Sequence, residues 1–201
     1  MYIEAVILGI IIGLARNGRL SNFFEAQFKG WVLSFFALLL FLMPYLLKVL
    51  DVSYDKLQIF PYFAMVIIAL IALLNFQKTG MKILLVGLVL NLIVMGLSDY
   101  KMPVDTTAME TLGFGSFVES MDQGEVVNYV RLSESDGVGG LLGKVIPLPK
   151  AYPFAKVLSF GDIIVSVGIA FIIQYEMLLS SLKARGSMVQ FTYNTKFRRR
   201  G

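Results

Sequence analysis

The amino-acid sequence predicts an all-α membrane protein, a bundle of about five transmembrane helices with a partly structured extracytoplasmic loop between helices 4 and 5. Its composition, its apolar segments and its sorted charges predict this fold. Of the 201 residues, 57% are hydrophobic and only 16% are charged, whereas roughly a quarter of the residues of soluble domains are charged. A soluble core could not bury so much apolar surface, so we expect lipid to be the solvent for most of it.

Five apolar segments are candidates for membrane helices, which need about 20 residues to cross a hydrocarbon core of roughly 30 Å. The first, Tyr2 to Ala15, is short and contains Glu4, so it either crosses a locally thinned bilayer or dips into one leaflet. We expect it to be a mature helix with its N-terminus outside, because the flank before the apolar run carries Glu4 in place of Lys or Arg and no signal-peptide cleavage site follows before the basic connection. The other four segments are Trp31 to Leu50, Ile59 to Phe76, Met81 to Leu97 and Gly161 to Leu182.

The basic residues collect in alternate connections between these segments. The connection from Arg16 to Gly30, the pair Lys78 and Lys82, and the tail after Leu182 together hold 11 of the 18 Lys and Arg residues. Cytoplasmic connections carry such an excess. The sequence therefore predicts a multi-pass plasma-membrane protein with its N-terminus outside and its C-terminus in the cytoplasm. Its expected divisions are four membrane helices in 1–98, an extracytoplasmic loop or cap in 99–160, a fifth helix in 161–182 and a basic cytoplasmic tail in 183–201.

The loop is too apolar for a plain linker and should contain structure of its own. Thr107 to Glu110 reads as a capping box before apolar residues at helical spacing, which predicts one amphipathic helix reaching Met121. Val126 to Leu132 is expected to be extended, and Asp136 to Gly140 to be a flexible turn. The segment Leu141 to Phe154 contains three prolines, so it should lie across the outer interface or fold back over the bundle as a cap.

Several short motifs, in order along nearly the whole chain, carry a family resemblance. They are Arg16 to Asn22, Asn91, Lys101 to Val104, Leu142 to Pro149 and Ser159 to Asp162. On these residues the chain resembles an uncharacterised family of small polytopic bacterial membrane proteins, domain of unknown function 5317. The resemblance implies architecture and location, with no activity to carry over. The chain departs from the family pattern at Lys144 and at Ser98 to Lys101, so no role is transferred to their charges.

Arg16, Asn17 and Arg19 form the first candidate binding site. The two arginines flank an Asn-Gly turn, where they can anchor the topology through lipid phosphates. The alternative is a small anion or headgroup site made of two guanidinium groups and the turn amides.

Asp162 is the second candidate, at the start of the last helix. Ser159 and Asp162 have capping-box spacing, which favours a structural role. The alternative is an outward-facing cation or proton site with Glu4, Asp99 or Asp105 as neighbours.

Glu176 and Asn91 lie inside apolar segments, where polar groups need partners. At about 1.5 Å per residue, Glu176 is roughly 8 to 9 Å below the inner boundary, so it should pair with Lys78, Lys82 or Lys183, or serve as a relay or substrate contact. Asn91, like Asn75, is expected to form interhelical hydrogen bonds more readily than to bind a ligand.

The expected partners are lipids, with anionic headgroups at the basic cytoplasmic face. Gly9 and Gly13 form a GxxxG motif, which predicts packing within the bundle or, alternatively, a homodimer face. The basic tail with its aromatic residues favours lipid over nucleic acid, and no nucleic-acid partner is predicted.

Three classes of function remain open. The first is a binding or assembly subunit that interacts with lipid and partner proteins. The second is a small transporter or channel that uses Glu176, Asn91 and Asp162. The third is a membrane-embedded enzyme acting on lipid, although the absence of His and Cys removes the usual bases and thiolates, and neither a cofactor nor a metal is predicted.

Overall fold

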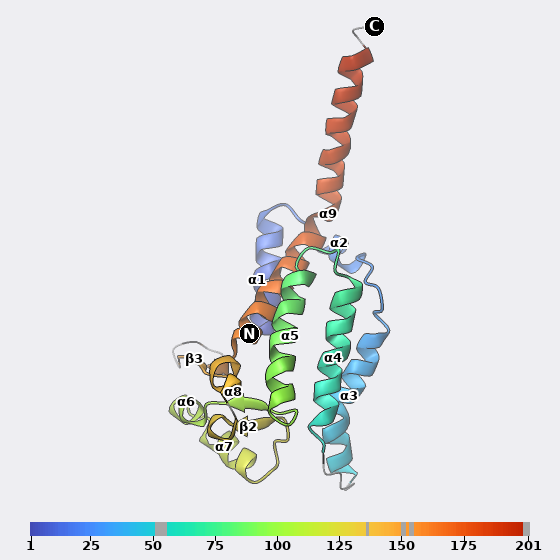
Figure 1. Cartoon of the computed structure of the whole chain (residues 1–201). Coiled ribbons are helices and arrows are strands. Elements are labelled where there is room, and N and C mark those ends of the chain that lie inside the picture. Colours follow the sequence, from blue (N-terminus) through green and yellow to red (C-terminus); the bar gives the residue numbers. More distant parts are fainter. Residues whose placement is uncertain (51–55, 136, 150–151, 153–154, 199–201) are drawn as a thin grey trace.

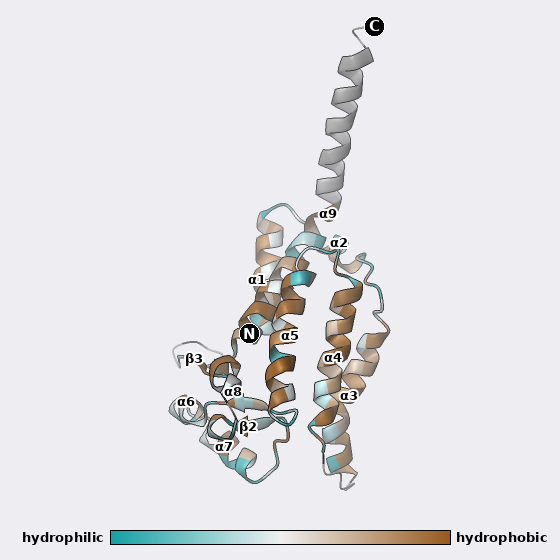
Figure 2. Cartoon of the chain, viewed as in Figure 1, coloured by the Kyte–Doolittle hydropathy of each residue, from teal (hydrophilic) through white to brown (hydrophobic). Residues whose placement is uncertain are grey.

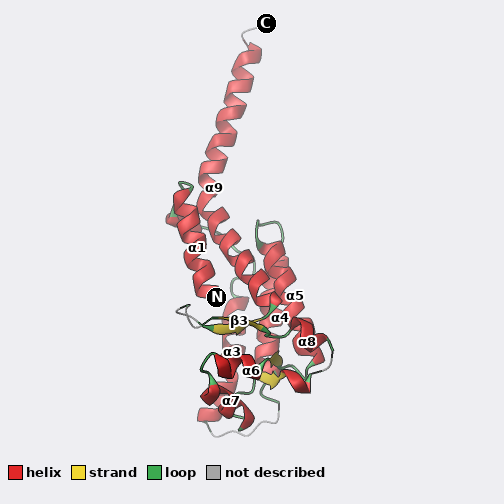
Figure 3. Ribbon diagram, turned by 90° about the vertical axis from the view of Figure 1, so that its left-hand side faces the viewer, coloured by secondary structure: helices red, strands yellow, loops and turns green. Residues whose placement is uncertain are grey.

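The computed structural model describes residues 1–50, 56–135, 137–149, 152 and 155–198, with side chains described through residue 179 except at positions 138 and 140. Most of this part of the chain is helical, and the long helices run side by side (Figure 1). These helices are α1 (Tyr2–Ala15), α3 (Leu33–Val49), α4 (Ile59–Leu74), α5 (Met81–Leu97) and α9 (Phe160–Arg198). The short helices and strands of the 99–160 loop gather at one end of them, and the C-terminal half of α9 projects beyond the other end (Figures 1 and 3).

The apolar segments of the sequence place the long helices to within about two residues, except at the end of α9. That helix continues to Arg198, so the prediction that it stops at Leu182 is wrong. Residues 183–198 contain no proline that would stop the helix, so α9 can continue past the apolar segment. One short helix, α2 (Leu20–Phe24), lies in the first basic connection.

Helices α5 and α9 touch along a line of glycines. A Cβ atom on Gly87 would lie 2.7 Å from the amide nitrogen of Val165, and one on Gly168 would lie 2.6 Å from that of Leu84. Backbones this close leave no room for side chains, as is common where membrane helices associate. The pair α5–α9 therefore forms the centre of the bundle.

The glycines of the GxxxG motif pack α1 against α9. A Cβ atom on Gly9 would lie 2.9 Å from the carbonyl oxygen of Ala170, and one on Gly13 would lie 2.7 Å from the sulfur of Met177. The GxxxG motif therefore packs within the bundle, which is the first of its two predicted roles. A homodimer through the same two residues would require α9 to leave this face.

Helices α3 and α4 form a hairpin that rests on α5 through α4. Asn75, at the end of α4, is hydrogen-bonded to Lys29 in the connection that precedes α3. Its side chain accepts a hydrogen bond from the Lys29 amide and donates to the Lys29 carbonyl oxygen, each at 2.8 Å. The prediction that Asn75 is a structural hydrogen-bonding residue is confirmed.

The loop between α5 and α9 differs from the predicted single helix. Two helices, α6 (Thr106–Thr111) and α7 (Gly115–Asp122), are separated at Gly113, whose φ of +94° breaks the helix. The predicted capping box at Thr107 is also wrong, because the Asp105 carboxylate accepts the Ala108 amide at 3.0 Å and caps α6.

Two small sheets complete the loop. β1 (Met102–Val104) pairs in parallel with β2 (Tyr129–Arg131), and β3 (Ile146–Leu148) pairs antiparallel with β4 (Lys156–Leu158). The extended segment predicted at Val126 to Leu132 is confirmed only for Tyr129–Arg131, since residues 127–128 form a turn and Leu132 begins the 3-10 helix η1 (Leu132–Glu134). Helix α8 (Val138–Leu142) occupies most of the predicted flexible turn, of which Asp136 lies outside the described residues.

The long helices are apolar, and hydrophilic residues collect in their connections (Figure 2). Among the described residues, one segment, Phe160–Leu179 of α9, is long and apolar enough to cross a membrane. Helices α1, α3, α4 and α5 are apolar but shorter, with 14 to 17 residues each. The prediction of a mostly helical chain is confirmed, and its finer part, five membrane spans, stays a prediction.

Candidate functional site

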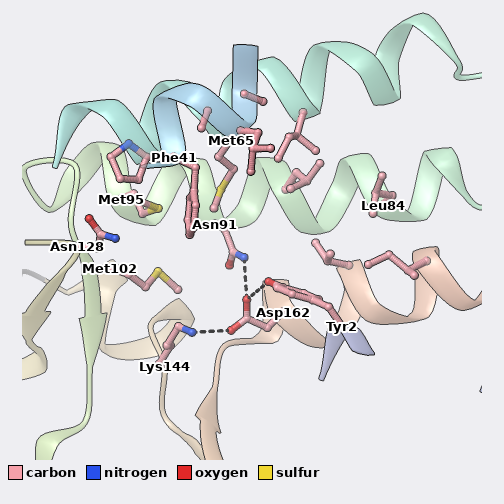
Figure 4. A pocket seen from close by; sticks show the side chains of 18 of the residues that line it. Tyr2, Phe41, Met65, Leu84, Asn91, Met95, Met102, Asn128, Lys144 and Asp162 are labelled. Atoms are coloured by element: carbon pink, nitrogen blue, oxygen red, sulfur yellow. Dashed lines mark hydrogen bonds and ion pairs between the residues drawn. The ribbon is translucent and has the colours of Figure 1, made fainter. Parts of the chain in front are cut away.

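A cavity of about 690 Å³ lies between the α3–α4 hairpin and the α5–α9 pair (Figure 4). Most of its wall is apolar and comes from all four helices. Apart from Ser34, near the start of α3, the polar side chains collect at one end, where the 99–160 loop meets the helices. The apolar lining residues are Ala37, Leu38, Phe41, Pro61, Ala64, Met65, Ile68, Leu84, Leu88, Met95, Met102, Val165 and Ile169.

Asp162 stands at the polar end, in the first turn of α9. The Ser159 hydroxyl accepts the Asp162 amide at 2.9 Å, while the Asp162 carboxylate accepts the Ser159 amide at 3.2 Å. This reciprocal pair is a capping box, so the predicted structural role of Asp162 is confirmed. The cap fixes the carboxylate beside the cavity.

The same carboxylate joins three further parts of the chain (Figure 4). The Tyr2 hydroxyl of α1 donates to Oδ1 at 2.7 Å, and Asn91 Nδ2 of α5 donates to the same oxygen at 3.2 Å. Lys144 Nζ, from the segment after α8, lies 3.3 Å from Oδ2. We call Tyr2, Asn91, Lys144, Ser159 and Asp162 the Asp162 cluster.

The expected carboxylate neighbours of Asp162 lie elsewhere, so that part of the prediction is wrong. Glu4 pairs with Lys156, Asp99 accepts a hydrogen bond from Gln58, and Asp105 caps α6. A buried carboxylate is stabilised by a cation and by donors, whereas other carboxylates would repel it. Lys144 is the cation that stabilises the Asp162 carboxylate. In the part of the chain that the structure describes, no three His, Cys, Asp or Glu side chains are grouped to hold a metal ion.

Lys144 reaches the cavity because its backbone is fixed beside β1. It forms a β-bridge with Val104, and its amide donates to the Pro103 carbonyl oxygen at 2.8 Å. The ammonium group lies 5.4 Å from the centre of the Tyr129 ring. Burial lowers the pKa of Lys144, but attraction by Tyr129 and Asp162 outweighs it, so the pKa is raised above its usual value and the ammonium stays charged at neutral pH.

Asn91 is 3% exposed and is held from both ends of its amide. Its Oδ1 accepts the Ser159 hydroxyl at 2.9 Å, while its Nδ2 donates to Asp162. A Cβ atom on Gly161 would lie 2.0 Å from Oδ1. The predicted hydrogen-bonding role of Asn91 is confirmed, and Gly161 is what allows α9 to approach it.

Glu176 lies away from this cluster, toward the other end of the bundle. It is 2% exposed and forms an ion pair with Lys78 at 2.7 Å. The Lys78 ammonium also lies 4.4 Å from the centre of the Phe28 ring. The predicted pairing of Glu176 with Lys78 is confirmed, and the cavity wall does not include Glu176.

The turn with Arg16, Asn17 and Arg19 is exposed and separate from the cavity. Asn17 has a φ of 62°, the left-handed conformation expected of an Asn-Gly turn. The turn docks on α9, because the Arg19 amide donates to the Met177 carbonyl oxygen at 3.0 Å. Of the six predicted site residues, the structure joins Asn91 and Asp162 at the cavity, while the turn with Arg16, Asn17 and Arg19 docks next to Glu176 away from it.

Tyr2, Lys144 and Asn128 line the cavity and were not predicted. Lys144 could have been noticed as a single cation within the apolar stretch from Leu141 to Leu148, and Tyr2 as a polar-tipped aromatic residue that opens the first apolar segment. Nothing comparable marks Asn128, which lies in the loop just before β2.

Comparison with known proteins gives a family and no activity. A family model described as "Family of unknown function (DUF5317)" matches residues 25–174. That range contains four of the five members of the Asp162 cluster, all except Tyr2. Neither a curated protein nor a solved structure matches the chain. The chain belongs to the DUF5317 family, whose function is unknown.

Proposed function

We propose that this chain is a multi-pass plasma-membrane protein that binds an amphiphilic molecule, a lipid, in the cavity beside the Asp162 cluster. In this proposal α1, α3, α4, α5 and α9 cross the membrane, with the N-terminus outside and the basic C-terminus in the cytoplasm. The exposed faces of these helices support it, since Ile3 is 71% and Phe35 62% exposed. Soluble monomers rarely expose large contiguous apolar surfaces.

The observation that carries the proposal is the cavity, whose helical walls are apolar except for Ser34 and whose other polar side chains collect at one end. Ligand pockets in proteins commonly measure about 300 to 1,000 Å³ and combine apolar walls with a few polar groups. A lipid has the same division, with an apolar chain and a polar head. The chain would lie along α3, α4, α5 and α9, and the head would meet the Asp162 cluster.

A small transporter is the second candidate, with less support. Transport through the bundle would need a polar path from Asn91 toward Glu176, and Glu176 is engaged by Lys78 outside the cavity wall. An enzyme acting on lipid would need a base or metal ligands, and the Asp162 carboxylate is already occupied by four partners. Lipid binding needs neither a polar path nor a free carboxylate, so it requires no change in the arrangement of these residues.

The test is to identify lipid that remains bound after purification in mild detergent. Native mass spectrometry should detect one lipid per protein in the wild type. Ala64→Phe fills the cavity from α4 and should abolish the adduct, whereas Leu70→Phe changes the exposed face of the same helix and should retain it. Ala37→Phe offers a second way to fill the cavity, from α3. A folded Ala64→Phe or Ala37→Phe variant with the wild-type adduct would refute the proposal.

A further inference from the structure

We infer that the polar end of the cavity selects a lipid whose headgroup is uncharged and carries hydroxyl groups. This inference rests on the proposed lipid-binding function and adds the chemistry of the head. It follows from the charge balance of the Asp162 cluster and from a buried polar atom of Asn128 that has no hydrogen-bond partner among the described residues.

The first step concerns charge. Lys144 and Asp162 lie 3.3 Å apart and neutralise each other without a ligand. The Asp162 carboxylate also accepts hydrogen bonds from Tyr2, Asn91 and the Ser159 amide. Because a carboxylate accepts about four hydrogen bonds, these donors and Lys144 use its capacity. An anionic head would have to compete with Asp162 for Lys144. A cationic head would have to compete with Lys144 for Asp162. Each would add an unbalanced charge to a buried site, which is costly.

The second step concerns hydrogen bonds. Asn128 lines the cavity (Figure 4), and its Oδ1 atom is buried without a hydrogen-bond partner among the described residues. An unsatisfied buried acceptor costs roughly 1 to 3 kcal/mol, so a ligand whose hydroxyl group reaches this oxygen and donates to it gains affinity. Lys144 supplies a donor nearby, because an ammonium has three N–H groups and its hydrogen bonds to Asp162 and Tyr129 use two.

A hydroxyl group meets both needs, since it donates to an amide oxygen and accepts from an ammonium. An ionised phosphate diester only accepts, and a quaternary ammonium has no N–H to donate. The ligand class that fits is therefore a neutral lipid alcohol, with a glycerol or sugar head on one or more apolar chains. Diacylglycerol is the simplest probe of this class.

The experiment measures binding of three lipids with identical dioleoyl chains, diacylglycerol, phosphatidic acid and phosphatidylcholine, to the full-length protein in detergent. Native mass spectrometry should show a preference for diacylglycerol of about tenfold or more over both phospholipids. Asn128→Leu should reduce diacylglycerol binding about tenfold, the equivalent of roughly 1.4 kcal/mol. Gln123→Leu, an exposed change in the same loop, should leave it unchanged.

A second part of the experiment uses a variant that should reverse the preference between a neutral and an anionic lipid. Asp162→Asn keeps an acceptor but leaves Lys144 unbalanced, so phosphatidic acid should now bind better than diacylglycerol. Equal or tighter binding of phosphatidic acid by the wild type would overturn the inference while leaving lipid binding intact. Failure of all three lipids to bind, with normal folding, would refute the proposed function itself.

Discussion

Asp162 combines two tasks that usually fall to different residues. It closes the capping box with Ser159, and it accepts hydrogen bonds from Tyr2 and Asn91 beside the Lys144 cation. Its helix-capping role was predictable because the Ser-x-x-Asp spacing is local. Its other partners were not, since Tyr2 lies 160 residues away in the sequence and no local pattern relates the two.

Ser159→Ala should destabilise the protein more than a neighbouring serine change does. The substitution removes both the cap of the Asp162 amide and the bond to Asn91, with an expected loss of about 1 to 2 kcal/mol. Ser166→Ala removes only a donor to the Asp162 carbonyl oxygen one turn along α9 and should cost about 0.5 kcal/mol or less. Thermal unfolding in detergent, followed by circular dichroism, measures both, and equal losses would contradict this account.

The Lys78–Glu176 pair should respond asymmetrically to the loss of either partner. Lys78→Met leaves the Glu176 carboxylate, whose side chain is 3% exposed, without its cation, whereas Glu176→Met leaves Lys78, whose side chain is 23% exposed and can reach solvent. Breaking a buried pair typically costs about 3 to 5 kcal/mol, and we expect that range for Lys78→Met and less for Glu176→Met.

The double variant Lys78→Met/Glu176→Met provides the control for that comparison. With both charges removed, its midpoint of thermal unfolding should recover above that of Lys78→Met alone. A double variant as unstable as the sum of the two single variants would show that the residues do not act as a pair.

At the scale of elements, the long helices were predictable and the loop was predictable only in part. Runs of apolar residues set the positions of α3, α4 and α5, because the length of such a run is a property of the local sequence. The loop depends on the left-handed Gly113 and on the parallel pairing of β1 with β2. Parallel pairing joins distant segments, and neither feature follows from hydrophobic periodicity.

The glycine contact between α5 and α9 should be sensitive to a single methyl group. Gly168→Ala would place Cβ 2.6 Å from the Leu84 amide nitrogen, a backbone atom that cannot move without separating the helices. We expect a loss of about 1 to 3 kcal/mol, the usual cost of overpacking. Gly115→Ala in α7 is the matched control, since no atom lies within 4 Å of its Cβ position. Thermal unfolding of the two variants tests this, and similar midpoints would count against the contact.

At the scale of the molecule, the Asp162 cluster arises only when α1, α5, α9 and the 99–160 loop come together, and the cavity needs the α3–α4 hairpin as well. Composition and charge sorting predicted the mostly helical architecture. They could not predict the cavity, because its shape depends on how the α3–α4 hairpin rests on α5. Of the site, only Asn91 and Asp162 were predictable from the sequence. Each is a polar residue within or at the start of an apolar segment, which makes it conspicuous.

The proposed orientation can be tested with single cysteines, because the chain contains none. A cysteine at Gln123, in the 99–160 loop, should react with a membrane-impermeant maleimide on intact cells. One at Asn17 should react only after the cells are permeabilised, since positive connections stay in the cytoplasm. Both sites are exposed, and the unsubstituted chain is the blank. The opposite labelling pattern would show the opposite orientation. Labelling of both sites on intact cells would contradict the proposed topology.

Met65, Met95 and Met102 line the cavity together, which exposes the proposed binding function to oxidation (Figure 4). Thioethers are flexible and polarisable, so this wall can adapt to apolar chains of different shape. Oxidation to the sulfoxide would place a strong dipole where an apolar chain should lie. A protein of this design would thus lose its ligand under oxidative stress and recover it when the sulfoxides are reduced.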